Sequence, residues 1–326
     1  MGRDRRERAA PDWGLVIGVG ALVAIGLVMI FSASSVSGYA EHQDTAYYLK
    51  RQALWLALSL PPAVVAYRMD YRKLKQWTPW ILFLAFLSLV AVLLPHVGTM
   101  VGGARRWLSL GPLSFQPSEF AKLALVIYLA QALSEKHERV TSLQRGVVPV
   151  MLIAGVMALL VLRQPDMGTA SLYIMTGLLM LFVAGARLPH LMATLATLAP
   201  LVAYVVLMSP YKRARILAFL NPWKDPQNTG FHIIQSLLAL GSGGVTGLGL
   251  GHSTQKFFYL PERHTDFIFA IIGEELGLAG AAAVILLFVL LAVWGYRISS
   301  RLSDRYGVLL TTGLVTMLVG QAALNI

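Results

Sequence analysis

The segment 259–278, which reads YLPERHTDFIFAIIGEELGL, brings an acidic residue to the start of a predicted membrane helix. A polar cluster that includes Arg263 and His264 leads to Asp266, and an apolar run follows at once, so Asp266 should lie where water meets hydrocarbon. An ionised group at that depth costs about 2.5–3.5 kcal/mol unless a cavity or a partner relieves it. A carboxylate beside such cations could act as a general base. The alternative is that Thr265 or Asp266 only caps the helix.

Two further acids, Glu274 and Glu275, follow about two turns later on the same segment. A helix that served only as a wall in the membrane would not carry three acids, because each is costly there. The segment therefore predicts a functional site.

A second polar group lies around the start of another predicted helix. Its members are Arg105, Arg106, Trp107, Glu119 and Lys122. Glu119 and Lys122 are three residues apart, so they share one helical face and can pair. Such a pair could only lock helices together. We favour a polar pocket near the outer surface, whereas Trp107 by itself would be an ordinary interfacial anchor.

Two loops carry weaker signals. Residues 163–169, RQPDMGT, either form a tight turn with a local contact between Arg163 and Asp166 or contribute to a site. Six glycines between 241 and 251 resemble loops whose amides cradle phosphate. Their spacing matches neither the P-loop nor the dinucleotide-binding pattern, so a flexible loop is the favoured interpretation.

The composition is typical of a polytopic membrane protein. The chain has 326 residues, of which 56% are hydrophobic and 13% charged, and its mean hydropathy is +0.65. Cysteine is absent, which excludes disulfides, thiolate metal sites and cysteine nucleophiles. The net charge of +11 does not indicate nucleic acid, because the basic residues fall between apolar runs rather than in one stripe.

The apolar runs predict a single integral membrane domain over 1–326, which begins with a cytoplasmic tail at 1–12. Nine runs are long enough to cross about 30 Å of hydrocarbon, at 13–33, 48–67, 77–95, 117–134, 146–163, 168–185, 188–208, 266–295 and 306–326. No cleavable signal peptide is evident. With the N-terminus in the cytoplasm, the inner segments hold fifteen Lys and Arg residues and the short outer loops hold five, which satisfies the positive-inside rule.

The predicted outer loop 209–265 is much longer than an ordinary connection, and such loops tend to be functional or disordered. It contains FHIIQSLLALGSGG, which predicts a re-entrant or interfacial helix in a structured loop. Its basic residues are Lys212, Arg213, Arg215, Lys224, Lys256 and Arg263, against only two acids, Asp225 and Glu262. Positive charge on the outer side opposes the topology signal, so we expect an anionic headgroup as its partner.

Ordered motifs extend along nearly the whole chain. They are FSASS at 31–35, RRW at 105–107, FQPSEFAK at 115–122, RQPDMGT at 163–169, NPWKDP at 221–226, QSLLALGSGG at 235–244 and LPERHTDFIFAIIGEELG at 260–277. With these motifs the chain resembles the SEDS family (shape, elongation, division and sporulation) of bacterial peptidoglycan polymerases. NPWKDP and the segment 247–262 resemble its division-type branch, FtsW, more than its elongation-type branch, RodA.

The resemblance implies an all-α polytopic membrane protein with ten helices that joins the disaccharides of lipid II into glycan strands. The chain contains nine of the ten implied spans, so we expect the C-terminal tenth span to be missing. The essential aspartate of the family falls on Asp266, its charged pair on Glu119 and Lys122, and its extracellular tryptophan on Trp107.

The implied reaction inverts the configuration at the donor sugar, which suits a single displacement. Asp266 would take the proton of the acceptor hydroxyl. The departing undecaprenyl pyrophosphate needs positive charge. The candidates that would bind the substrate beside Lys122 are Arg105, Arg106, Arg213, Arg215, Arg263 and His264. A divalent cation, Mg²⁺ or Mn²⁺, could assist, but the sequence offers no dedicated cage of ligands.

The resemblance also implies the setting of the reaction. The protein would lie in the bacterial cytoplasmic membrane with its active site on the outer face. Its partner would be a class B penicillin-binding protein, a transpeptidase, together with other membrane proteins of the division or elongation complex. The alternative functions are a lipid II flippase, with Glu119, Lys122 and Glu274 along the path, and a structural scaffold.

Overall fold

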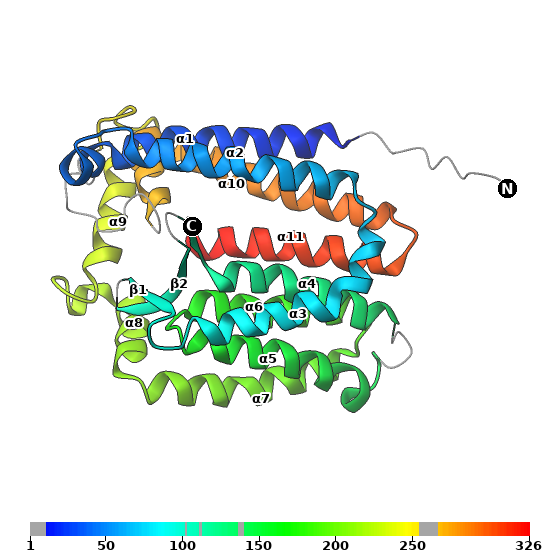
Figure 1. Ribbon diagram of the computed structural model, residues 1–326. Coiled ribbons are helices and arrows are strands. Elements are labelled where there is room, and N and C mark those ends of the chain that lie inside the picture. Colours follow the sequence, from blue (N-terminus) through cyan, green and yellow to red (C-terminus); the bar gives the residue numbers. More distant parts are fainter. Residues whose placement is uncertain (1–10, 102, 111–112, 136–139, 254–266) are drawn as a thin grey trace. The chain divides into compact units, whose positions relative to one another are not determined.

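The computed structural model describes residues 11–101, 103–110, 113–135, 140–253 and 267–326. Within them the chain forms eleven α-helices and one small antiparallel sheet (Figure 1). The helices are α1 (Trp13–His42), α2 (Tyr47–Arg68), α3 (Leu74–Ala91), α4 (Pro117–Glu135), α5 (Val148–Leu162), α6 (Met167–Val183), α7 (Leu188–Leu207), α8 (Pro210–Leu220), α9 (Phe231–Ser242), α10 (Ile268–Arg301) and α11 (Arg305–Asn325).

The chain divides into two compact units. Unit 1 comprises Met1–Leu54 and Ser236–Arg297, and unit 2 comprises Trp55–Gln235 and Ile298–Ile326. The single domain predicted over 1–326 remains a prediction.

Each of the nine predicted spans coincides with one helix. Six helical segments among the described residues are long and apolar enough to cross a membrane, and they contain α1, α3, α5, α7, α10 and α11. Three predicted spans coincide with helices outside these six segments. They are α2, which contains Pro61 and Pro62, α4, which carries charged residues, and α6, which has only 17 residues. The count of nine spans therefore remains a prediction. The long loop contains two helices, α8 and α9, and α9 occupies the position of the predicted re-entrant helix.

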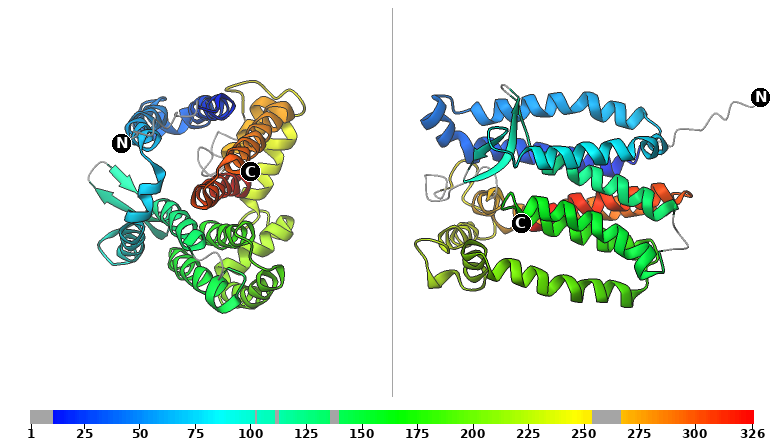
Figure 2. Two further views of the ribbon diagram at one scale, coloured as in Figure 1. Left: turned by 90° about the vertical axis from the view of Figure 1, so that its right-hand side faces the viewer. Right: turned by 60° about the horizontal axis from the view of Figure 1, so that its bottom comes forward.

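The predicted helical architecture holds for the described residues, and the one addition to it is a small three-stranded sheet in the segment before α4. Its strands are β1 (Gly98–Val101), β2 (Ala104–Leu110) and β3 (Leu113–Phe115), paired antiparallel in the order β1-β2-β3. The sheet lies at one end of unit 2, where β2 contacts α4 (Figure 2). The register pairs Thr99 with Trp107 and Leu108 with Phe115. Strands β1 and β3, with four and three residues, are too short to give a clear alternating pattern.

Unit 2 is built on a layer of helices in which α4 and α6 pack against α3, α5 and α11 (Figure 1). The centre of its core contains Leu125 and Leu129 of α4, Tyr173 of α6 and Leu309 of α11, none more than 1% exposed. Gly313 permits the close approach of α11, since a Cβ there would lie 2.6 Å from Val126 Cγ1. Small residues at such contacts are the usual solution for helices in membranes.

Side chains at the start of α11 join three parts of unit 2. Asp304 caps α11 by accepting a hydrogen bond from the Gly307 amide at 2.9 Å. Its carboxylate also accepts a hydrogen bond from the Tyr71 hydroxyl and lies 3.4 Å from Nη2 of Arg72. Arg305 donates to the carbonyl of Ala184 at 2.7 Å. The segment before α3 and the end of α6 are thereby tied to α11.

Unit 1 is organised around α1 and α10. Its core contains Met29 and Ala33 of α1 and Ile271 of α10. A Cβ at Gly14 or Gly18 would lie 2.8 or 2.6 Å from the Trp294 ring, so the two glycines accommodate the indole of α10.

The glycine-rich stretch is attached to α10, which corrects the favoured interpretation of a flexible loop. The amides of Leu248 and Gly249 each donate at 3.0 Å, to the carbonyls of Glu274 and Glu275. In return the Leu278 amide donates to the Gly244 carbonyl at 2.9 Å. These carbonyls and this amide are available because α10 is interrupted at Gly277, whose φ is 67°.

Candidate functional site

The predicted pair of Glu119 and Lys122 forms, and a third residue joins it. Nζ of Lys122 lies 2.7 Å from the Glu119 carboxylate and 2.5 Å from Oε1 of Gln321 on α11. The Lys122 side chain is 6% exposed and that of Glu119 is 48% exposed. A buried ammonium is stable only when its donors are satisfied. The group therefore places a paired cation inside unit 2, with its carboxylate partner open to the surroundings.

The first turn of α4 positions this cation. Pro117 is the first residue of the helix, where its missing N–H costs no hydrogen bond. Ser118 is fully buried, and its carbonyl accepts a hydrogen bond of 2.8 Å from the Tyr173 hydroxyl of α6. This contact fixes the start of α4, one turn before Lys122.

Strand β2 separates the predicted residues 105–107 onto two faces, since successive strand side chains point to opposite sides. Arg105 and Trp107 share one face, and both are half-buried. Arg106 points to the other face, where its Nε donates to the Gln164 carbonyl at 2.8 Å and its Nη2 to the Pro165 carbonyl at 2.6 Å. Arg106 therefore holds the 163–166 turn, and Arg105 is the stronger candidate for contact with a substrate.

In the 163–166 turn Asp166 binds Thr169 rather than Arg163, the partner that the local-contact interpretation predicts. The Asp166 carboxylate caps α6, accepting from the Thr169 amide at 3.0 Å and from the Thr169 hydroxyl at 2.9 Å. The turn is thus a helix cap that an arginine of the sheet supports. Arg163 itself is exposed.

The predicted residues of the long loop fall into two groups. Arg213 and Arg215 lie exposed on α8, which follows α7 directly and is capped by Ser209. Asp266, Arg263 and His264 lie outside the described residues, so their predicted roles remain predictions.

Unit 1 contains a second polar group, built on Glu274 and Glu275 of α10, which are both 0% exposed. The Ser32 hydroxyl of α1 donates to Glu275 at 2.5 Å, and the Ser253 amide donates to it at 3.4 Å. The Ser253 hydroxyl donates to Glu274. The FSASS and GEELG motifs, far apart in the sequence, therefore meet in one buried cluster.

Sequence reasoning missed Gln321, Ser253 and the carbonyls that Arg106 binds. Gln321 carried a usable signal, because an amide in an otherwise apolar span is costly unless it has a partner. The other two give no such signal, since serines and backbone carbonyls occur throughout any chain. Among the described residues, no three His, Asp or Glu side chains group closely enough to hold a metal ion.

Comparison with known proteins identifies the family. The family described as "Cell cycle protein", which unites FtsW, RodA and SpoVE, matches residues 13–326. The chain belongs to this family. The resemblance of its motifs to the SEDS proteins is confirmed, and the chain is accordingly a helical, multi-pass membrane protein.

Named relatives of this SEDS chain are similar over most of their length. Stage V sporulation protein E of Bacillus subtilis is 43% identical over 98% of this chain and 87% of its own. A probable peptidoglycan glycosyltransferase FtsW of Geobacter metallireducens is 41% identical over 94% of this chain and 81% of its own.

Solved structures show the same fold. One chain from a study of polymerization and crosslinking by a peptidoglycan synthase complex has a TM-score of 0.75 at 32% identity, and covers 95% of this chain and 84% of its own. The rod shape determining protein RodA of Thermus thermophilus has a TM-score of 0.67 at 29% identity, and covers 95% of this chain and 82% of its own.

Proposed function

We propose that this SEDS protein is a peptidoglycan glycosyltransferase that polymerises lipid II and releases undecaprenyl pyrophosphate. The observation that carries the proposal is the buried Lys122, held between Glu119 and Gln321 in unit 2. A cation fixed in this way is suited to a diphosphate leaving group. The names of the FtsW relatives, which are probable peptidoglycan glycosyltransferases, support the same activity.

The reaction is a single displacement at the donor sugar. The acceptor 4-hydroxyl attacks the anomeric carbon, the bond from that carbon to the pyrophosphate oxygen breaks, and the α-linkage becomes a β-linkage. Asp266 accepts the proton of the attacking hydroxyl, and help of this kind contributes about 10²–10⁴-fold. Undecaprenyl pyrophosphate leaves with the electron pair.

The positive charge that the leaving group needs comes from preorganised side chains. Lys122 is held in place by two acceptors, so little reorganisation is required when charge develops. Arg105 on β2, and Arg213 and Arg215 on α8, would contact the phosphates or the sugars of the incoming lipid. Arg106 would act through the 163–166 turn that it holds.

The setting of the reaction follows from the predicted topology. The N-terminus lies in the cytoplasm, and the active site faces the outside, where lipid II is displayed. The branch resemblance favours septal synthesis. A class B penicillin-binding protein would be the partner, which agrees with the peptidoglycan synthase complex among the similar structures.

A gel assay of glycan products from labelled lipid II tests the proposal, with and without a co-purified transpeptidase. We expect polymer from the unmodified protein, and more of it with the partner. A proteoliposome assay run in parallel measures lipid II flipping. Flipping without any glycan product would contradict the proposal and favour the transporter alternative.

A further inference from the structure

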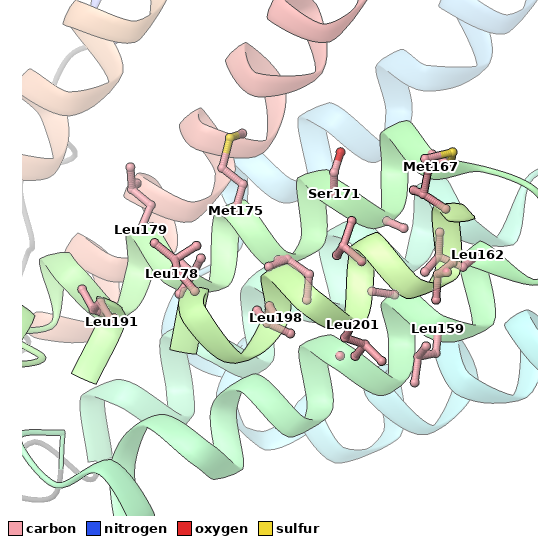
Figure 3. Close-up of a pocket in the computed structure, with 18 of the residues that line it drawn as sticks. Leu159, Leu162, Met167, Ser171, Met175, Leu178, Leu179, Leu191, Leu198 and Leu201 are labelled. Carbon is pink, nitrogen blue, oxygen red and sulfur yellow. The ribbon is translucent and has the colours of Figure 1, made fainter. Parts of the chain in front are cut away.

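Unit 2 contains an apolar groove between α5, α6 and α7, with a volume of about 630 Å³ (Figure 3). Sites for small molecules typically measure about 300–1,000 Å³. Ser171 is the only polar side chain among the described residues that line it. Its floor includes small residues of α5 and α6, among them Gly155 and Ala170. The groove is therefore suited to hydrocarbon.

The groove and the Lys122 group lie on different faces of α6. Ser171, Ile174 and Leu178 of α6 line the groove. Tyr173 and Thr176 turn the other way, where the Tyr173 hydroxyl binds the Ser118 carbonyl of α4 and Thr176 contacts Met317 of α11. A hydrocarbon chain in the groove would therefore occupy a site of its own, separated from Lys122 by α6.

The length of the groove favours a lipid whose hydrocarbon chain is longer than an ordinary acyl chain. Its lining on α6 runs from Met167 to Phe182, and on α7 from Leu188 to Val206. At 1.5 Å per residue these stretches measure about 23 and 27 Å. One leaflet contributes only about half of the roughly 30 Å hydrocarbon core. A chain anchored at one face must pass the midplane to fill the groove, and ordinary acyl chains end near that plane.

Charge marks the end at which the headgroup would lie. Exposed Arg163 directly follows Leu162, which lines the groove at the end of α5. Lys212 and Arg213 lie in the first turn of α8, shortly after α7 ends. Asp166 is at the same end, but its carboxylate is engaged in capping α6. By the predicted topology this is the outer face, so an anionic headgroup fits there.

We propose that this groove binds the polyprenyl chain of a phosphate-linked carrier lipid anchored in the outer leaflet. The proposal rests on the proposed function, which supplies such a lipid as the substrate carrier and as the product. It adds a lipid site on the far side of α6 from Lys122. A polymerase that joins two lipid-linked molecules must accommodate their polyprenyl chains as well as their polar headgroups, so a hydrocarbon site in addition to the polar pocket is expected.

Photo-crosslinking tests this proposal directly. The chain has no cysteine, so Ser171→Cys and Met192→Cys each place one benzophenone, in the two halves of the groove. The variants are placed in phosphatidylglycerol nanodiscs with undecaprenyl phosphate or with short geranyl phosphate at the same mole fraction. We expect undecaprenyl adducts at both positions, enriched roughly tenfold over the mole fraction. Geranyl phosphate should react at position 171 only.

Two glycines provide a block and its matched control. A Cβ at Gly155 would meet no atom from beyond its own helical turn within 4 Å, and the same is true of Gly20 on α1, which is not among the residues that line the groove. Gly155→Leu should fill the groove and remove the enrichment, whereas Gly20→Leu should leave it unchanged. Gly20→Cys carries the reference benzophenone, whose adducts should follow the mole fractions. If Gly155→Leu fails to fold, the test of the groove site rests on the comparison of undecaprenyl phosphate with geranyl phosphate at position 192.

Adducts at positions 171 and 192 that only follow the mole fractions would overturn the inference. Equal labelling of position 192 by the short and the long lipid would do the same. Glycan synthesis is measured on the same preparations. Glycan polymer without enrichment of undecaprenyl adducts would contradict the groove site alone. Enrichment of the adducts without glycan polymer would contradict only the proposed enzymatic function.

Discussion

Lys122 of α4 and Gln321 of α11 are joined by a hydrogen bond of 2.5 Å between Nζ and Oε1, although 199 positions separate them in the sequence. The contact makes α11 a structural part of the charged group in unit 2. With Glu119 it supplies two acceptors to an ammonium whose side chain is only 6% exposed. The position of the proposed phosphate-binding cation thus depends on how α11 packs.

Replacement of Gln321 by Leu should lower glycan synthesis by about 10–100-fold, because a hydrogen bond to a charged group contributes about 1.5–3 kcal/mol. Gln321→Glu retains an acceptor at Lys122 and serves as the control. Rates of polymer formation from labelled lipid II are compared at equal amounts of folded protein. Equal loss of activity in both variants would contradict a role for the acceptor.

Arg105 and Arg106 should respond differently to substitution by Ala. Arg106→Ala removes two hydrogen bonds to the 163–166 turn, so the free energy of unfolding should fall by about 1.5–3 kcal/mol. Arg105→Ala should leave the melting temperature unchanged and reduce polymer synthesis. Thermal unfolding in detergent, together with the gel assay, separates the two effects. A normal melting temperature for Arg106→Ala would exclude its structural role.

The Asp304 carboxylate should make the stability of unit 2 depend on pH. Burial alone raises the pKa of Asp304, but hydrogen bonds from Tyr71, Gly307 and Arg72 together lower it below its ordinary value. Because the folded-state pKa lies below the unfolded value of about 3.9, this stabilisation is complete above about pH 4. It is lost as the pH falls through the folded-state pKa.

Asp304→Ala should therefore destabilise the protein at neutral pH by about 0.5–2 kcal/mol, the usual contribution of an N-cap residue. Below the folded-state pKa the difference from the unmodified protein should shrink. Melting temperatures between about pH 3 and pH 7 provide the measurement. A difference that stays constant over this range would show that the charge of Asp304 contributes nothing.

Gly247 and Gly277 should not tolerate a side chain. Both have positive φ, 82° and 67°, and a Cβ at Gly247 would lie 2.2 Å from the Glu275 carbonyl oxygen. Gly247→Ala should therefore cost more than the roughly 1–2 kcal/mol of left-handed backbone alone. Gly241→Ala, whose Cβ meets nothing within 4 Å, should be neutral or slightly stabilising. Thermal unfolding compares the two, and equal stability would contradict the attachment of the loop to α10.

Local patterns in the sequence were sufficient to predict ten of the eleven described helices, all except α8, and the pair of Glu119 with Lys122. Apolar runs of membrane length mark the spans, and a spacing of three residues fixes a shared helical face. Gln321 could not be assigned in the same way, because its contact depends on the packing of α11 against α4. The meeting of Ser32 with Glu275 has the same origin, since 243 positions separate them.

The sheet before α4 escaped prediction for a different reason. Strand β1 has four residues and β3 has three, so neither shows the alternation that reveals a longer strand. The glycine-rich stretch was interpreted as flexible because glycine permits many conformations. Its fixed conformation follows from the interruption of α10 at Gly277, which frees main-chain groups for hydrogen bonds. Gly273, Gly277 and Gly280 lie close together on α10, so the sequence alone does not show which of them interrupts the helix.

We propose that this protein joins lipid II molecules with Asp266 as the general base. The most direct measurement compares purified unmodified protein with Asp266→Asn, each with its transpeptidase partner, in the gel assay of labelled lipid II. We predict glycan polymer from the unmodified protein and none from Asp266→Asn, at equal melting temperature and equal lipid II binding. Polymer from Asp266→Asn at the unmodified rate would exclude Asp266 as the general base.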